Sequence, residues 1–99
     1  MVARSLIWVV ALGASALASA QDPAQVRLLA SNCTTCHGPD GHSQGGIASL
    51  AGQSRARIAE AMLEFKSGKR PATVMQQLSK GYTDAEIDAL ATFFSAQKN

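Results

Sequence analysis

Two cysteines and a histidine lie within five residues of one another in the string Cys33-Thr34-Thr35-Cys36-His37. Thiols at this spacing can form thioethers to two substituents on one edge of the same porphyrin. The histidine that follows directly then falls under the ring, where its imidazole can bind the iron. The string therefore predicts one covalently bound haem c, with Cys33 and Cys36 as thioether sites and His37 as the proximal ligand.

Three other uses of a cysteine pair explain the string less well. A thioredoxin-like redox pair needs a βαβ context, and the sequence gives no sign of one. A tetrahedral zinc site needs a fourth ligand, for which only His42 is spare. A disulfide suits an exported chain but gives His37 no role. Haem attachment is the interpretation that uses all three side chains.

The first twenty residues have the three parts of a secretory signal peptide. Arg4 gives a positive start, residues 6–12 form an apolar run, and Ala18-Ser19-Ala20 is a small-residue cleavage site. The apolar run is too short for a membrane span, which takes about 20 residues. We therefore expect cleavage of residues 1–20, a single domain over residues 21–99, a periplasmic location and no stable membrane anchor after cleavage.

A domain of this size has little apolar surface to bury, and small domains often rely on a cofactor or a covalent staple. A haem would supply the missing core. The formal net charge of the whole sequence is only +2. This charge is too small to indicate nucleic acid or any other particular partner.

The remaining sequence has helical patterns, without the alternating or β-branched runs that indicate strands. Asp22, Pro23 and Gln25 predict the start of a first helix that leads into a turn at Cys33. The stretch 38–46 is rich in glycine and other turn-forming residues, which predicts an irregular loop around the haem edge.

Capping residues predict three further helices. Ser54 and Gly68 fit the two ends of a second helix, and a short third one is expected over residues 74–79. Thr83 and Glu86 have capping-box spacing and precede the apolar stripe of a terminal helix. We therefore predict an all-α fold of about four helices around the haem.

Two methionines downstream of the cleavage site compete for the sixth position on the iron. Met62 falls on the apolar stripe of the second helix, where an ordinary core role explains it. Met75 lies beyond Gly68 and Pro71, where an irregular chain can cross to the other face of the ring. We therefore predict Met75 as the distal ligand. His/Met ligation raises the reduction potential and leaves no open site on the iron, as expected of an electron carrier rather than an enzyme.

Basic residues bracket the second helix and could steer an acidic partner. Acidic side chains are interspersed with them, as on an ordinary solvated helix face. The basic residues are Arg55, Arg57, Lys66, Lys69 and Arg70, and the acidic ones are Glu60 and Glu64.

With these features, the sequence resembles the class I cytochromes c over almost all of residues 21–99. Residues 33–41 and Leu50-Ala51-Gly52-Gln53 look like the small c4 and c5-type bacterial members. Residues 72–87 are similar to the stretch around the ligand methionine in the cytochrome subunit of flavocytochrome c sulfide dehydrogenase. The resemblance implies a class I cytochrome c fold, thioethers at Cys33 and Cys36, and iron ligation by His37 and Met75.

The resemblance also implies partners and a role. A periplasmic haem subunit of this kind takes electrons from a flavoprotein that oxidises sulfide and passes them to a further cytochrome or oxidase. A free soluble carrier that serves an oxidase or another respiratory partner stays open. So does a haem ligand sensor or peroxidase-like enzyme, in which the sixth position is open to small molecules.

One position departs from the resemblance. Relatives often have a proline two residues before the Leu-Ala-Gly-Gln string, whose carbonyl accepts the second ring N–H of the proximal histidine. Here that position is Ala48. Alanine keeps the carbonyl, so the hydrogen bond to His37 can persist, but it lacks the fixed φ of proline.

Overall fold

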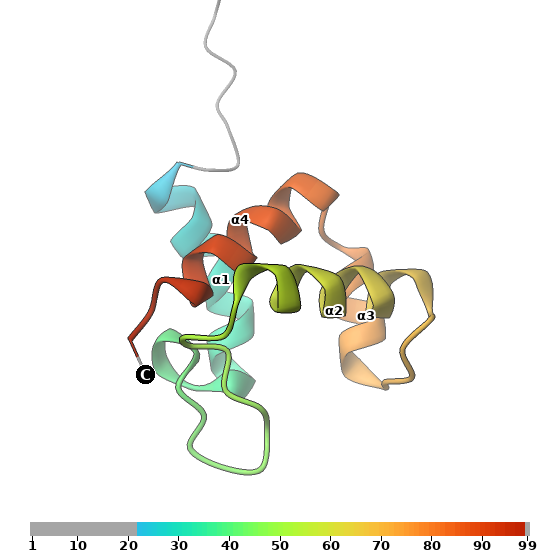
Figure 1. Ribbon diagram of the computed structural model, residues 1–99, viewed down its shortest axis with the longest axis horizontal. Coiled ribbons are helices and arrows are strands. Elements are labelled where there is room, and N and C mark those ends of the chain that lie inside the picture. The colour runs from blue at the N-terminus through green and yellow to red at the C-terminus, as the bar shows by residue number, and fades with distance from the viewer. Residues whose placement is uncertain (1–21, 99) are drawn as a thin grey trace, which may run out of the picture.

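The computed structural model describes residues 22–98, and the predicted signal peptide at residues 1–20 lies outside this range. The described chain folds into four α-helices and a short 3-10 turn, η1 (Figure 1). Among residues 22–98 there is no strand, and no helix is long and apolar enough to cross a membrane. The all-α prediction is therefore confirmed. The elements are α1 (Pro23–His37), η1 (Pro39–Gly41), α2 (Arg55–Ser67), α3 (Val74–Lys80) and α4 (Asp84–Ser95).

The predicted capping residues lie at the starts of these helices. The Asp22 carboxylate accepts a hydrogen bond from the Ala24 amide at 3.0 Å, and the Ser54 hydroxyl accepts one from the Arg57 amide at 3.1 Å. Thr83 and Glu86 form the predicted capping box at the start of α4. These side chains accept from amides that have no partner within their helix, so they fix where each helix begins.

The first helix is longer than predicted. It runs through His37 instead of giving way to a turn at Cys33, and Gly38 ends it with φ of 88°. Within this last part of the helix, the hydroxyls of Thr34 and Thr35 donate to the Ser31 carbonyl instead of to groups outside the helix. Cys33 and Cys36 therefore lie three positions apart on one face of the helix.

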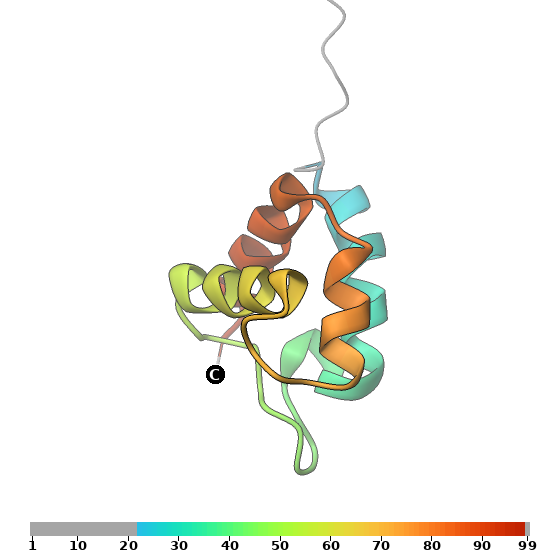
Figure 2. The same cartoon turned by 90° about the vertical axis from the view of Figure 1, so that its right-hand side faces the viewer.

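The fourth helix is the centre of the packing. It contacts both α1 and α2, while α3 packs against α2. Figures 1 and 2 show that the loop between η1 and α2 extends away from one end of this bundle. The α4 residues Ile87, Leu90, Ala91 and Phe94 are almost completely buried, and they form one core with Ala30 of α1, Ile58 and Met62 of α2, and Tyr82.

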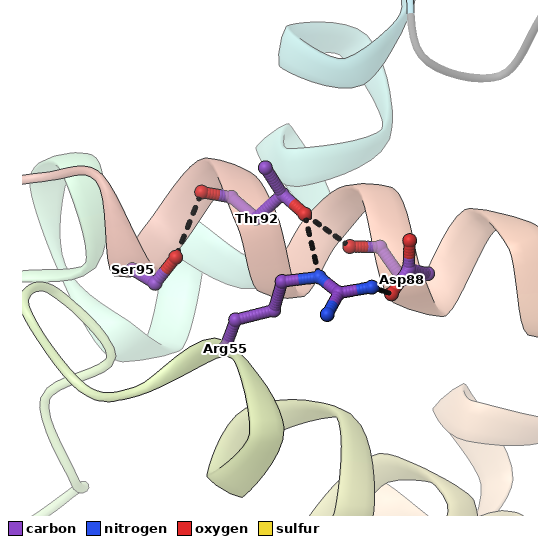
Figure 3. A network of polar contacts seen from close by, with 4 residues as sticks. All are labelled: Arg55, Asp88, Thr92 and Ser95. Carbon is purple, nitrogen blue, oxygen red and sulfur yellow. Dashed lines mark hydrogen bonds and ion pairs between the residues drawn. The ribbon is translucent and has the colours of Figure 1, made fainter.

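Polar contacts fix α2 to α4 at both ends. Near the start of α2, the Arg55 guanidinium pairs with Asp88 and donates to the Thr92 hydroxyl at 3.2 Å (Figure 3). Near its end, the Lys66 ammonium donates to the Tyr82 carbonyl at 2.7 Å and pairs with Asp84 at 2.9 Å. Exposed pairs of this kind stabilise a fold by only about 0–1 kcal/mol each, so they set the alignment of two helices that apolar burial holds together.

Truncation of Ile87 should test this division between core and surface. Ile87 is 1% exposed, so Ile87→Ala should lower the free energy of unfolding by about 2–5 kcal/mol through lost burial and a residual cavity. Leu63→Ala is the matched control, because Leu63 is 42% exposed on α2. Urea unfolding of the two variants provides the measurement. Equal losses would contradict the central position of α4.

Candidate functional site

A cavity of about 380 Å³ lies between α1, α2, α3 and the loop that precedes α2. Cavities of this size, with mainly apolar walls and a few polar groups, are typical of cofactor and ligand sites. The walls contain every residue for which the sequence predicts a haem role. The residues that line it include Cys33, Cys36, His37, Ala48, Leu50, Ile58, Met62, Phe65, Met75, Tyr82, Leu90 and Phe94.

The two cysteines reach the cavity from the last turns of α1. Both are free thiols, with Cys33 half-buried and Cys36 exposed. Burial raises the pKa of the Cys33 thiol, and the neighbouring Tyr82 hydroxyl lowers that pKa by a smaller amount. The Cys33 thiol is therefore held in its neutral form, which suits an apolar wall.

The His37 ring is oriented by the loop before α2. Its Nδ1 lies 2.6 Å from the Ala48 carbonyl oxygen, so Nδ1 carries the proton and donates, while Nε2 keeps its lone pair. The Ala48 carbonyl thus accepts the hydrogen bond from His37 that the sequence allowed. A histidine with Nδ1–H on a carbonyl is in the tautomer that binds a metal through Nε2.

Backbone contacts of Gly41 hold the loop in the position that this bond needs. The Gly41 carbonyl accepts from the amides of Leu50 and Ala51 at 2.8 and 3.2 Å. Gly41 has φ of 84° and packs so closely against Phe94 that a side chain would not fit. Farther along the loop, the Gly52 amide donates to the Phe94 carbonyl at 3.1 Å. The sequence did not predict these contacts of Gly41 and Gly52, although Gly52 belongs to the Leu-Ala-Gly-Gln string.

Both candidate methionines line the cavity. Met62 is 8% exposed and belongs to the core, and its sulfur lies 3.7 Å from the Ser79 hydroxyl, which can donate to it. The same hydroxyl donates to the Met75 carbonyl at 2.6 Å. Met75 is half-buried at the start of α3. The fully buried Ser79 thus contacts both methionines, a role that no sequence signal indicated.

Tyr82 joins α1 to the segment between α3 and α4. Its hydroxyl donates to the Leu29 carbonyl at 3.4 Å and accepts from the Asn32 side-chain amide at 3.3 Å. Burial raises the pKa of Tyr82, so the phenol stays protonated and remains a donor at physiological pH. The ring thereby closes the part of the cavity that lies next to Cys33.

The structure does not bring His42 to the cysteines. Its ring nitrogens face the carbonyls of Pro39, at 3.1 Å, and Lys98, and the residue lies outside the cavity wall. Within residues 22–98 no group of three or more His, Cys, Asp or Glu side chains could hold a metal ion. The zinc interpretation therefore lacks its fourth ligand in the described part of the chain.

The donor set fits a haem c. Two thiols lie on one helix face, the His37 imidazole lines the cavity from the same helix, methionines line it from two other helices, and most of the remaining wall is apolar. Such a group, when bound, supplies an iron that gains and loses single electrons. The residues around it hold the ring, exclude water and adjust the potential of the iron.

Comparisons with known proteins agree with this site. Residues 20–94 match the family described as cytochrome c oxidase, cbb3-type, subunit III. The chain is 43% identical over 67 residues to the cytochrome subunit of sulfide dehydrogenase from Chlorobaculum tepidum, across 68% of this chain and 61% of that protein. It is 32% identical over 92 residues to cytochrome c-553 from Helicobacter pylori, across 91% of this chain and 96% of that protein.

A further relative is the thiosulfate dehydrogenase electron acceptor of Thiomonas intermedia, which is 32% identical over 97 residues. The chain spans less than two thirds of the length of this relative and of the sulfide dehydrogenase subunit, at 45% and 61%. The match over residues 20–94, the full-length likeness to a small cytochrome and the all-helical fold lead to one assignment. The chain belongs to the c-type cytochromes, in the family of cbb3-type oxidase subunit III, and binds haem c.

Proposed function

We propose that this cytochrome acts in the periplasm, after loss of residues 1–20, as the electron-accepting subunit of a sulfide-oxidising flavoprotein. Its haem is attached at Cys33 and Cys36 and ligated by His37 and Met75. The observation that supports this ligand set is that all four residues line the same cavity. With both axial positions filled by protein, the iron exchanges electrons and does not bind substrate.

The choice of Met75 over Met62 rests on how each sulfur is engaged. The Met62 sulfur belongs to the packed core and already faces the Ser79 hydroxyl. Met75 is on a helix separate from α2, and its backbone carbonyl is held by Ser79 while its side chain is half-buried at the cavity. Met75 only packs against the edge of the core, so its flexible thioether can turn toward an iron more easily than that of Met62, which is buried within the core.

The proposed partner is supported by the likeness to the sulfide dehydrogenase subunit and by the surface around the cavity. Three apolar side chains at this surface line the cavity and are also exposed, namely Ile47 at 47%, Val74 at 60% and Leu78 at 39%. An apolar rim around a redox centre suits a contact that must bring two cofactors close together.

A free carrier that serves an oxidase is the second candidate function. The matched family is described as an oxidase subunit, and the cytochrome c-553 relative is matched over nearly its whole length. The two candidates share the haem site and differ only in the donor and acceptor. A haem enzyme or sensor would instead require an open sixth position on the iron.

The first prediction for this site concerns covalent attachment. The purified protein should keep the mass of one haem after denaturation, as read by mass spectrometry. Cys33→Ala and Cys36→Ala should each lose much of that yield, because each removes one thioether. Ser31→Ala, on the same helix but outside the cavity wall, should retain it. Haem that dissolves into acidified organic solvent from the unmodified protein would rule out the attachment.

The second prediction separates the two methionines. Met75→Ala should make the reduced iron high-spin and reactive toward carbon monoxide, and should lower the reduction potential. Met62→Ala should keep the ligation spectrum and lower the free energy of unfolding by about 2–5 kcal/mol as a buried truncation. Optical spectra with and without carbon monoxide decide between them. The reverse result would make Met62 the distal iron ligand. If the unmodified protein itself reacts with carbon monoxide, the enzyme or sensor is favoured.

The third prediction addresses the partner. Mixed with the flavoprotein subunit of a sulfide dehydrogenase and sulfide, the oxidised haem should be reduced rapidly in a stopped-flow experiment. Sulfide alone should reduce it slowly, because the protein has no sulfide-oxidising centre of its own on this proposal. Leu78→Asp, which puts a charge on the apolar rim, should slow the flavoprotein-dependent rate more than Leu28→Asp on the exposed side of α1. Equal reduction with and without the flavoprotein would favour the free carrier.

A further inference from the structure

Among residues 22–98, the cavity wall contains two fixed positive charges and no carboxylate. Arg57 and Arg70 are the only arginine or lysine side chains among the residues that line it, and no aspartate or glutamate is among them. The other walls are apolar or neutral apart from the His37 ring. An apolar cavity with two guanidinium groups favours a ligand that carries two negative charges.

A haem is such a ligand, because it carries two propionates on the porphyrin edge opposite the two substituents that form thioethers. The proposed attachment at Cys33 and Cys36 fixes the thioether edge to α1, so the propionates face other elements of the fold. Arg57 belongs to the first turn of α2, and Arg70 to the connection between α2 and α3. We infer that Arg57 and Arg70 bind the two haem propionates.

The basic side chains around α2 divide into two groups on structural grounds. Arg55 and Lys66 are engaged with α4, through Asp88 and Thr92 and through Asp84 and the Tyr82 carbonyl. Their positive charges serve to align the two helices. Arg57 and Arg70 line the cavity instead, so their charges can act on the cofactor.

The two arginines are not equivalent. Arg70 Nε donates to the Glu64 carboxylate at 3.2 Å, and its guanidinium lies 5.4 Å from the centre of the Phe65 ring. These contacts hold the guanidinium in place and neutralise part of its charge. Among the described residues no ion pair is formed by Arg57. Arg57 therefore offers its propionate a full positive charge, while Arg70 shares its charge between Glu64 and the second propionate.

Glutamine variants of the haem-loaded protein test the inference. Arg57→Gln and Arg70→Gln should each shift a propionate band in the redox-difference infrared spectrum of protein made with carboxyl-labelled haem. Each should also lower the reduction potential, because a propionate without its cation favours the oxidised iron. Arg55→Gln is the matched control on the same helix and should leave bands and potential unchanged. Arg57→Lys should lower the potential less than Arg57→Gln, since an ammonium keeps the charge but cannot bind a carboxylate in bidentate fashion.

Glu64→Gln isolates the shared charge on Arg70. It should shift one propionate band in the unmodified background and leave the bands unchanged in the Arg70→Gln background. The inference is wrong if either arginine variant keeps the bands of the unmodified protein, or if Arg55→Gln shifts them equally. The proposed His/Met ligation is read separately, from the Met-to-iron charge-transfer band of the same samples. Loss of that band would overturn the ligation and leave the propionate assignment measurable.

Discussion

Burial of the apolar stripe on α4 is the constraint from which the rest of the structure follows. Ile87, Leu90 and Phe94 are almost inaccessible to water, and α1 and α2 both pack against the helix that carries them. Two helices on one central helix leave a space between them, which α3 and the loop before α2 enclose. Leu90 and Phe94 are part of both the core and the cavity wall, so the same apolar burial that holds the helices together also forms the walls of the haem site.

Most of the fold could be predicted because its signals are local. The caps at Asp22, Ser54 and Thr83 satisfy amides within one turn, and each one marks a helix start that the structure confirms. The end of α1 could not be predicted from the same rules. Cysteine, threonine and asparagine have weak helix propensity, yet the helix continues through them as far as His37.

In the candidate site, too, some residues could be predicted from local sequence signals and others could not. Cys33, Cys36 and His37 are neighbours in sequence, so their spacing alone predicts the role proposed for them. Ser79, Tyr82 and Arg57 act through contacts between residues far apart in the chain, or through a cavity that exists only once the helices have packed. No periodicity or short motif indicates such contacts. The surroundings of the two methionines and the two arginines in the cavity wall could therefore be identified only from the three-dimensional structure.

The two faces of the proposed haem site also differ in how they are built. Cys33, Cys36 and His37 belong to one continuous helix, whereas Met75 comes from the short helix α3, which follows a glycine and a proline and packs mainly on α2. A seven-residue helix with exposed Val74 and Leu78 can open at a lower free energy than the central core. On the proposed ligation, local unfolding would therefore free one axial bond while the other stays intact. On this proposal, the fold would combine a permanent cofactor anchor with an iron ligand that can be released separately.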